Sequence, residues 1–288
     1  MCQVADTVRV MQEQIDGKRC EGKVALVTGA SRGIGAAIAR RLASEGANVA
    51  CAARTLDPDP RYEGTLRETV AAIADSGGTA VPFQADLSDG DSRAALIDEV
   101  ASSLGPVDIL VNNAAVTFFL PIDSFPEKRF RLMMDVQVWG AIDLAQRVIP
   151  GMREAGGGSI LNITSRAAVK PMGPPYEPFY SDFGSSVYGL CKAALDRLTL
   201  GMAAELYADD ITCNALAPWD NVVTPGAAGH DLTEGYRTEP EECMAQAALE
   251  LTAPDPGGIT GRVAYSQSLL QEMGVEMRSL DGSPFTLS

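Results

Sequence analysis

A short apolar run, a glycine-rich turn and a helical run follow one another near the start of the chain. This succession constrains the fold more than any other feature. Val24 to Val27 is continuously apolar, as expected for a strand buried in a parallel sheet. Helical spacing follows from Gly35 to Ser44, and Asn48 to Ala53 favours a second strand. The predicted unit is therefore βαβ, with a turn over residues 29–35 between its first strand and its helix.

The turn has the sequence Gly-Ala-Ser-Arg-Gly-Ile-Gly. Backbone N–H groups in such a turn, together with the N-terminus of the helix, can approach a pyrophosphate. Glycine is needed because a Cβ would hold the phosphate away. A glycine triplet alone is often just a tight turn. Because this one lies between a strand and a helix, where phosphate binding requires it, the sequence predicts a nucleotide site.

The same alternation of strands and helices continues along the chain and favours the α/β class. The length of 288 residues suits one large α/β domain or two small ones. Further strands are predicted at 79–84, 107–111, 159–164, 212–216 and 262–266. Helices are predicted at 65–75, 92–104, 126–153 and 244–251, and in the run that begins at Val187. Residues 1–22 are predicted to form an extension, 166–186 a loop over a pocket, and about 219–245 a lid.

Charge and composition argue against several classes of function. The formal net charge is −15 with a single histidine, which argues against a nucleic-acid partner and against an anionic membrane surface. Six cysteines without CxxC spacing argue against a zinc cluster, so we expect no metal. No apolar run approaches the length of a membrane span, and charged residues interrupt the N-terminal apolar residues. We therefore expect a cytoplasmic protein without a membrane segment.

The end of the second predicted strand bears on the cofactor. A carboxylate at this place binds the ribose 2′-hydroxyl of NAD, whereas this chain has Ala53 and Arg54. Arg54, with Arg32 in the turn, can hold a 2′-phosphate by charge-assisted hydrogen bonds; the alternative is two solvated surface arginines. We expect NADP(H) in preference to NAD(H). Asp86, after the third strand, either reads an adenine edge or is an ordinary N-cap for the chain from Ser88 onward.

Tyr188 and Lys192 are four residues apart at the start of a helical run. On a helix this spacing places them on the same face, one turn apart. A phenol with a pKa of about 10 is a poor acid or base at neutral pH, but a fixed ammonium nearby favours the phenolate and lowers that pKa. The pair can therefore transfer protons. Most such spacings are ordinary surface pairs, and the nucleotide site predicted at the other end of the chain favours catalysis here.

Five motifs in register resemble the short-chain dehydrogenase/reductase family from Gly22 to about Gly274. They are TGASRGIG at 28–35, NNAA at 112–115, NITS at 162–165, YGLCK at 188–192 and NALAP at 214–218. Any one of them is weak evidence, whereas five in the family's order are strong. The resemblance implies a doubly wound, seven-stranded parallel sheet (Rossmann fold) with helices on both faces, in a single domain over residues 23–288. It also implies a homodimer or homotetramer joined through two long helices.

The resemblance assigns roles to matching positions. Tyr188 is the implied general acid or base for a small carbonyl or alcohol substrate, Lys192 lowers its pKa, and Ser165 hydrogen-bonds the substrate oxygen. Hydride transfer to or from the carbonyl carbon belongs to the cofactor. The implied cofactor-binding residues are Gly29, Ser31, Arg32, Gly33, Ile34, Gly35, Arg54, Asp86, Leu87, Asn113, Ala114, Tyr188, Lys192, Pro218 and Thr224.

Several positions depart from the family pattern. The helix asparagine that supports a proton relay to the lysine is matched by Gln137, which is one methylene longer, so the relay is altered, slower or made through the backbone carbonyl. The last glycine of NNAG is Ala115, and the glycine after the proline is Trp219, which narrows the nicotinamide end or forms a substrate wall. The interval from Ser165 to Tyr188 is also longer than usual, which enlarges the loop over the pocket.

The sequence thus predicts an NADP(H)-dependent oxidoreductase that acts on a secondary alcohol or ketone. Trp219 and the aromatic residues of loop 166–186 favour an apolar or aromatic substrate. The alternative is a catalytically altered nucleotide-binding sensor, motivated by Gln137 and Ala115, or a scaffold subunit positioned through residues 1–22. Retention of the serine, the tyrosine and the lysine together favours the enzyme.

Overall fold

The structure is a computed structural model that describes residues 18–60, 63–222, 224, 237–253 and 258–285. Seven strands form one sheet in the order β3-β2-β1-β4-β5-β6-β9, and each neighbouring pair is parallel. The prediction of a doubly wound, seven-stranded parallel sheet in one domain is confirmed. The strands are β1 (Val24–Thr28), β2 (Asn48–Ala53), β3 (Thr79–Gln84), β4 (Ile109–Asn112), β5 (Gly158–Ile163), β6 (Ile211–Ala217) and β9 (Val263–Tyr265).

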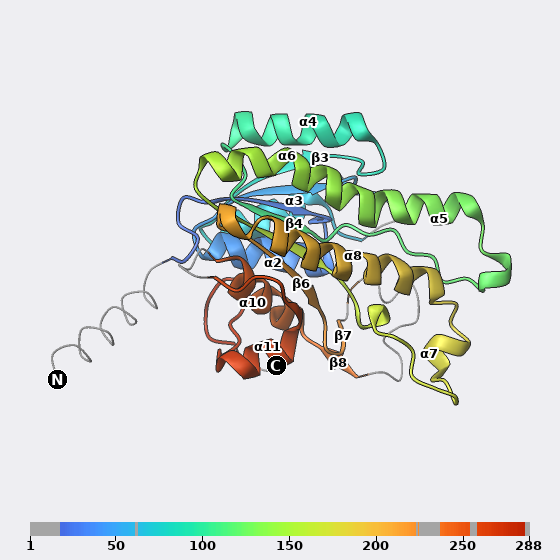
Figure 1. Ribbon diagram of the computed structural model, residues 1–288. Helices are drawn as coiled ribbons and strands as arrows, with labels where there is room; N and C mark the ends of the chain where they lie inside the picture. Colours follow the sequence, from blue (N-terminus) through green and yellow to red (C-terminus); the bar gives the residue numbers. More distant parts are fainter. Residues whose placement is uncertain (1–17, 61–62, 223, 225–236, 254–257, 286–288) are drawn as a thin grey trace.

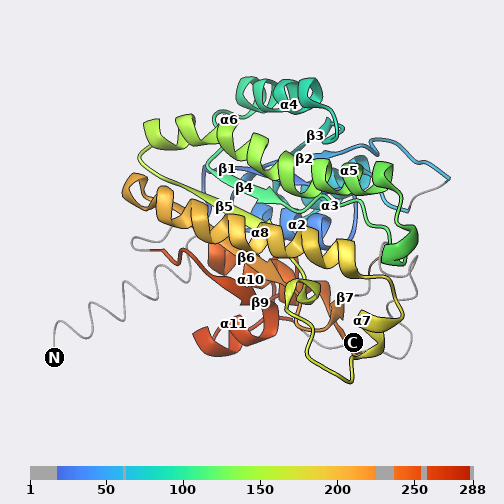
Figure 2. The same cartoon turned by 45° about the vertical axis from the view of Figure 1, so that its right-hand side comes forward.

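Helices cover both faces of the sheet, as Figures 1 and 2 show. One face packs against α2 (Gly33–Ser44), α3 (Leu66–Asp75), α10 (Glu241–Thr252) and α11 (Ser266–Met273). The other packs against α4 (Gly90–Ser103), α6 (Gly140–Glu154) and α8 (Ser186–Glu205). Both faces of the central strands are therefore buried, and all five residues of β1 are buried. This explains why the strands are continuous apolar runs rather than alternating ones.

The long helix predicted over 126–153 is divided in the structure. It consists of α5 (Glu127–Met134), a π-helical turn η2 (Asp135–Trp139) and α6. Periodicity does not reveal this, because a single wide turn shifts the apolar stripe without ending it. Turns of this kind often occur at functional sites, and η2 contains Gln137.

The structure contains short elements that the sequence did not predict. Loop 166–186 holds a 3₁₀ turn, η3 (Arg166–Ala168), and a short helix, α7 (Pro178–Ser181). Two further 3₁₀ turns are η1 (Ile122–Ser124) and η4 (Tyr207–Asp209). The start and the end of the predicted lid pair as a small parallel ladder, β7 (Asn221–Val222) with β8 (Thr238–Glu239). Most of the lid between them lies outside the described residues.

The predicted N-terminal extension also lies largely outside the described residues. Its last part, from residue 18, packs against the domain. Cys20 is fully buried, and Arg19 forms an ion pair with Glu250 on α10, with 2.8 Å between Nη1 and Oε1. No helix in the described part of the chain is long and apolar enough to cross a membrane.

The strand order places a crevice at one edge of the sheet. The chain passes from β1 outward through β2 and β3, and then returns to β4 on the other side of β1. In such sheets the connections after the two central strands leave in opposite directions. A crevice then opens beyond their carboxyl ends, where ligands bind.

Candidate active site

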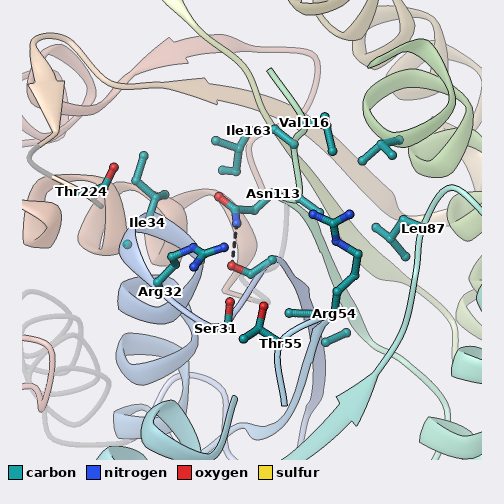
Figure 3. A pocket seen from close by; sticks show the side chains of 18 of the residues that line it. Ser31, Arg32, Ile34, Arg54, Thr55, Leu87, Asn113, Val116, Ile163 and Thr224 are labelled. Atoms are coloured by element: carbon teal, nitrogen blue, oxygen red, sulfur yellow. Dashed lines mark hydrogen bonds between the residues drawn. The ribbon is translucent and has the colours of Figure 1, made fainter. Parts of the chain in front are cut away.

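The crevice at the carboxyl ends of β1 and β4 is a cleft with a volume of about 320 Å³. All but one of the predicted site residues line it, and Figure 3 shows several of their side chains around the cavity. The predicted residues that line it are Gly29, Ser31, Arg32, Gly33, Ile34, Gly35, Arg54, Asp86, Leu87, Asn113, Ala114, Ser165, Tyr188, Lys192, Pro218 and Thr224. The exception is Gln137. Residues from the two ends of the chain thus meet in one place.

Close backbone packing makes two glycines of the turn necessary. Gly29 has φ +68°, and a Cβ there would lie 2.8 Å from Nδ2 of Asn113. A Cβ on Gly35 would collide with the carbonyl oxygen of Gly29. The Asn113 side chain donates to the carbonyl oxygens of Thr28 (2.9 Å) and Gly29 (3.3 Å), so it holds the turn in place as well as lining the cleft.

The N-terminus of α2 offers an anion site at the cleft. Arg32 is its N-cap residue and makes no side-chain cap hydrogen bond, and the first turn contains no acidic residue. The N–H groups and the positive end of the helix dipole are therefore not neutralised by the helix itself. The guanidinium of Arg32 donates to the carbonyl oxygen of Glu63 at 2.7 Å. Arg32 is thus anchored beside the cleft rather than fully solvated.

Arg54 and Asp86 lie together at the other end of the cleft. Burial acts to raise the pKa of Asp86, but hydrogen bonds from Ser88 and the charge of Arg54 outweigh it, so the pKa is lowered. Oδ1 of Asp86 accepts from the backbone N–H (2.9 Å) and the hydroxyl (2.8 Å) of Ser88. The carboxylate therefore caps this turn, whereas the N-cap of α4 is Asp89. A second cavity, of about 330 Å³, adjoins the cleft and shares Arg54 with it.

Ser165 and Tyr188 meet because a 3₁₀ turn packs tightly against α8. Ser165 lies two residues beyond the end of β5 and is the N-cap of η3, where its Oγ accepts from the N–H of Ala167 at 3.2 Å. A Cβ on Gly189 would lie only 2.7 Å from the carbonyl oxygen of Ala167, so glycine allows this approach. Burial raises the pKa of Tyr188, and a hydrogen bond with Ser165 acts in the opposite direction. The serine and the phenol are thus in direct contact.

Lys192 is buried with 3% of its surface exposed. Its Nζ donates to the carbonyl oxygen of Ile163 at 3.0 Å and lies 5.7 Å from the centre of the Tyr188 ring. Burial lowers the pKa of Lys192 to about 8. The expected lowering of the Tyr188 pKa by this ammonium is not found, because burial raises the pKa of the phenol and the ammonium donates to a carbonyl oxygen instead.

Gln137 lies behind the cleft. Its side chain is 2% exposed, and Nε2 donates to the carbonyl oxygen of Val116, which itself lines the cleft. Its Oε1 is buried and makes no hydrogen bond within the described part of the chain. The amide therefore supports the loop that follows β4 beside the cleft, and a relay role for Gln137 stays a prediction.

An aromatic cluster forms beside Tyr188, as the aromatics of loop 166–186 suggested. Phe119 contacts both Tyr188 (ring centres 5.3 Å apart) and Phe183 (4.6 Å), and Phe183 stacks with Phe179 at 5.8 Å. Trp219 does not line the cleft; it packs edge-on against Tyr265 at 5.9 Å. None of these phenylalanines lines the cleft either: Phe119 contacts the Tyr188 ring, and the loop residues Phe179 and Phe183 are joined to it through Phe119.

Several lining residues were not among the predicted site residues, although the sequence placed Ala53 and Ala115 near the cofactor: Ala52, Ala53, Thr55, Ala85, Ala115, Val116, Val136, Ile163 and Thr164. Most lie within two residues of a strand's carboxyl end, so strand position could have identified them. Val136 lies in the π-helical turn, and no sequence signal points to it.

Comparison with known proteins identifies the family. A family model described as short chain dehydrogenase matches residues 23–230. The chain belongs to the short-chain dehydrogenase family. This short-chain dehydrogenase is 32% identical over 262 residues to hydroxysteroid dehydrogenase-like protein 2 from Pongo abelii. That match covers 90% of this chain and 60% of the relative, so the chain spans about three fifths of the relative's length.

Solved structures of other short-chain dehydrogenases are similar over nearly their full length. A short chain dehydrogenase from Mycobacterium thermoresistibile is 32% identical, and the match covers 93% of this chain and 95% of that one, with a TM-score of 0.77. A metagenomic short-chain oxidoreductase in complex with NADP is 28% identical, with a TM-score of 0.69 and coverage of 86% and 98%.

Proposed function

We propose that this short-chain dehydrogenase is an NADP(H)-dependent oxidoreductase that interconverts a secondary alcohol and a ketone, with Tyr188 as general acid or base. The proposal rests on one observation. Ser165, Tyr188 and Lys192 converge on the same cleft as the glycine turn at the start of α2. A phenol in contact with a serine hydroxyl, beside an ammonium and a phosphate-binding turn, provides the groups that carbonyl reduction needs.

The donors around the cleft fit a dinucleotide. The N-terminus of α2 has neither a side-chain cap nor an acidic residue in its first turn, which suits a pyrophosphate. Asn113 and Ala114 line the adjoining wall, Thr224 lies beside Gly33 at the start of α2, and Lys192 lines the part near Tyr188. Bound there, a nicotinamide cofactor supplies or accepts the hydride.

The end of β2 favours NADP(H) over NAD(H). Arg54 lines the cleft where NAD-dependent members of this kind of fold carry a carboxylate. The metagenomic neighbour in complex with NADP supports the same choice.

The side chains then have separate tasks in the reduction. The Tyr188 hydroxyl donates the proton to the substrate oxygen, and in alcohol oxidation the phenolate accepts it. The Ser165 hydroxyl stabilises the charge that develops on this oxygen. The Lys192 ammonium, 5.7 Å from the centre of the Tyr188 ring, favours the phenolate by its charge.

The aromatic cluster beside Tyr188 favours an apolar substrate. Phe119, Phe179 and Phe183 form a continuous aromatic cluster that reaches the Tyr188 ring. Such a cluster binds flat or aromatic groups by burial and by edge contacts. We therefore propose an apolar or aromatic ketone or secondary alcohol as the substrate class.

A homodimer or homotetramer is part of the proposal. Trp139, Leu190 and Leu200 are 49%, 51% and 43% exposed on η2 and α8, the helical region through which the family resemblance places subunit contacts. Size-exclusion chromatography with light scattering is expected to give the mass of two or four chains of 30.3 kDa each. A monomer at micromolar concentration would contradict this part.

The catalytic assignment is tested by Tyr188→Phe, with turnover of NADPH measured on a panel of apolar ketones. We expect the wild type to oxidise NADPH and the variant to lose roughly 10²–10⁴-fold in kcat with little change in NADPH affinity. Tyr207→Phe is the matched control, because Tyr207 is 71% exposed on η4. Full turnover by Tyr188→Phe would contradict the assignment. NADPH binding without turnover of any ketone or alcohol would favour a nucleotide sensor.

A further inference from the structure

A carboxylate lies one helical turn beyond Lys192, and none of the proposed catalytic steps uses it. Asp196 follows Lys192 by four residues on α8, so the two side chains project from the same face. The Asp196 carboxylate hydrogen-bonds the side chain of Thr164, which directly precedes Ser165. Its Oδ1 is buried and makes no hydrogen bond to the chain that the structure describes. Asp196 thus lies behind the cleft, beside the chain that leads to Ser165, with one oxygen unsatisfied.

Burying a carboxylate in this way is unfavourable by itself. Desolvation raises the pKa of Asp196, while the Thr164 hydrogen bond and the Lys192 charge act against this rise. A buried oxygen without a hydrogen-bond partner costs free energy unless a neighbouring positive charge compensates for it. The only cation whose charge acts on Asp196 in the described structure is Lys192.

The surroundings of Lys192 point to the same pairing. Its ammonium has one hydrogen-bond acceptor among the described residues, the carbonyl oxygen of Ile163. Two groups act by charge to raise its pKa against the effect of burial, Cys191 and Asp196. Burial raises the pKa of the Cys191 thiol above 9.0, so this thiol is neutral at pH 7. The negative charge available to Lys192 therefore comes from Asp196.

The other groups around the pair do not supply an anion. On the sheet side these are the hydroxyls of Thr164 and Ser165, and on α8 the phenol of Tyr188. Tyr265 on β9 is affected by the charge of Asp196, and burial raises the pKa of its phenol, so it stays neutral as well. Arg166 on η3 is positive, and its guanidinium donates to the carbonyl oxygen of Trp219 at 3.1 Å.

We propose that Asp196 is a positioning residue that keeps Lys192 charged in its buried site by acting on it across one helical turn. The two groups do not need a direct hydrogen bond for this, because charges at such a separation interact more strongly in a partly buried site than in water. The consequence for catalysis rests on the proposed function, since only a charged Lys192 favours the Tyr188 phenolate. The electrostatic coupling itself is independent of any activity.

The coupling is measured in the cofactor-free protein by a double-mutant cycle. Asp196→Asn is compared in the wild-type background and in the Lys192→Met background by denaturant unfolding at pH 7. We expect Asp196→Asn to shift the unfolding equilibrium toward the unfolded state at least tenfold more in the wild-type background than in the Lys192→Met background. Where Lys192 has been replaced, Asp196→Asn is expected to be neutral or stabilising, because the carboxylate has lost its counter-charge. An equal effect in both backgrounds overturns the proposal, whether or not the protein is an oxidoreductase.

The pH profile of ketone reduction gives a second readout. Without Asp196 the pKa of Lys192 falls, so the alkaline limb of the kcat profile is expected to move to lower pH by about one unit, a tenfold change in proton concentration. Asp196→Glu keeps the charge and is expected to restore the wild-type limb. Glu205→Gln is the matched control, because Glu205 is an exposed carboxylate at the end of the same helix. An unshifted limb in Asp196→Asn counts against the proposal.

If Asp196→Asn does not fold, Asp196→Glu and Thr164→Val take its place. Thr164→Val removes the hydrogen bond that acts to lower the pKa of Asp196, so Asp196 loses part of its charge. The alkaline limb of the kcat profile is then expected to move to lower pH, by less than in Asp196→Asn. A shift in the opposite direction overturns the proposal.

Discussion

Replacement of Lys192 by methionine is expected to stabilise the cofactor-free protein while it removes a group that the proposed chemistry needs. Burial lowers the pKa of Lys192 from 10.5 to about 8. At about 1.4 kcal/mol per pH unit, this difference corresponds to about 3 kcal/mol of unfavourable burial of the ammonium at neutral pH. Loss of the hydrogen bond to the Ile163 carbonyl oxygen offsets about 1 kcal/mol of the gain. The attraction between Lys192 and Asp196 is already contained in the pKa of about 8, so a net stabilisation of about 2 kcal/mol remains.

The pH dependence of this gain has a definite sign. The folded-state pKa of about 8 lies below the ordinary value of 10.5, so between these values the unfolded chain binds more protons than the folded one. Wild-type stability therefore rises with pH across this window relative to Lys192→Met. Below pH 8 the lysine is protonated in both states, and the advantage of the variant is constant. Between pH 8 and about 10.5 the advantage shrinks and then vanishes.

Urea unfolding of both proteins at intervals from pH 7 to pH 10 measures this difference directly. In a thermal scan at pH 7, the unfolding midpoint of Lys192→Met is expected to be higher by about 5 °C. Leu200→Met on the exposed side of the same helix serves as the control and is expected to show no pH-dependent difference. The reasoning is refuted if Lys192→Met is less stable than the wild type at pH 7, or if its advantage stays constant up to pH 10.

Two further substitutions test packing around the site and in the fold. Gly189→Ala adds a Cβ 2.7 Å from the Ala167 carbonyl oxygen and is expected to displace η3, so that kcat falls roughly 10- to 100-fold at unchanged NADPH affinity. Gly201→Ala, where the Cβ meets only a flexible arginine, is its control, and equal kcat values for the two would contradict the argument. Arg41→Met breaks a buried ion pair with Glu45 and is expected to cost about 3 kcal/mol in denaturant unfolding. Arg131→Met, in an exposed pair, is expected to cost under about 1 kcal/mol. Similar costs for both would show that burial does not determine how much stability is lost when an ion pair is broken.

Most of the sheet and the cofactor side of the cleft could be predicted from the sequence. Strands buried on both faces are continuous apolar runs, so β1, β2 and β3 are found close to their true bounds. The turn from Gly29 to Gly35 is recognisable because the phosphate-binding geometry depends on glycine at fixed positions. Arg54 was identified because the end of β2 is a definite place in this fold.

The parts that the sequence did not reveal depend on tertiary contacts. The π-helical turn around Gln137 changes one hydrogen-bonding register inside a helical pattern, and periodicity is insensitive to that. The pKa of Tyr188 depends on how deeply the phenol is buried and on where the Lys192 ammonium points, and sequence spacing fixes neither. The position of Trp219 against Tyr265 likewise follows from the packing of β9, which is distant in sequence.

A fluorescence titration of the purified protein with NADPH and with NADH, side by side, tests the central claim most directly. The account predicts tighter binding of NADPH by roughly tenfold or more, about 1.4 kcal/mol. Arg54→Asp is expected to abolish or reverse this preference, whereas Arg153→Asp, an exposed arginine on α6, is expected to leave it unchanged. Binding of neither nucleotide would contradict the assignment of the cleft. Tighter binding of NADH by the wild type would contradict the role of Arg54 and the choice of NADP(H).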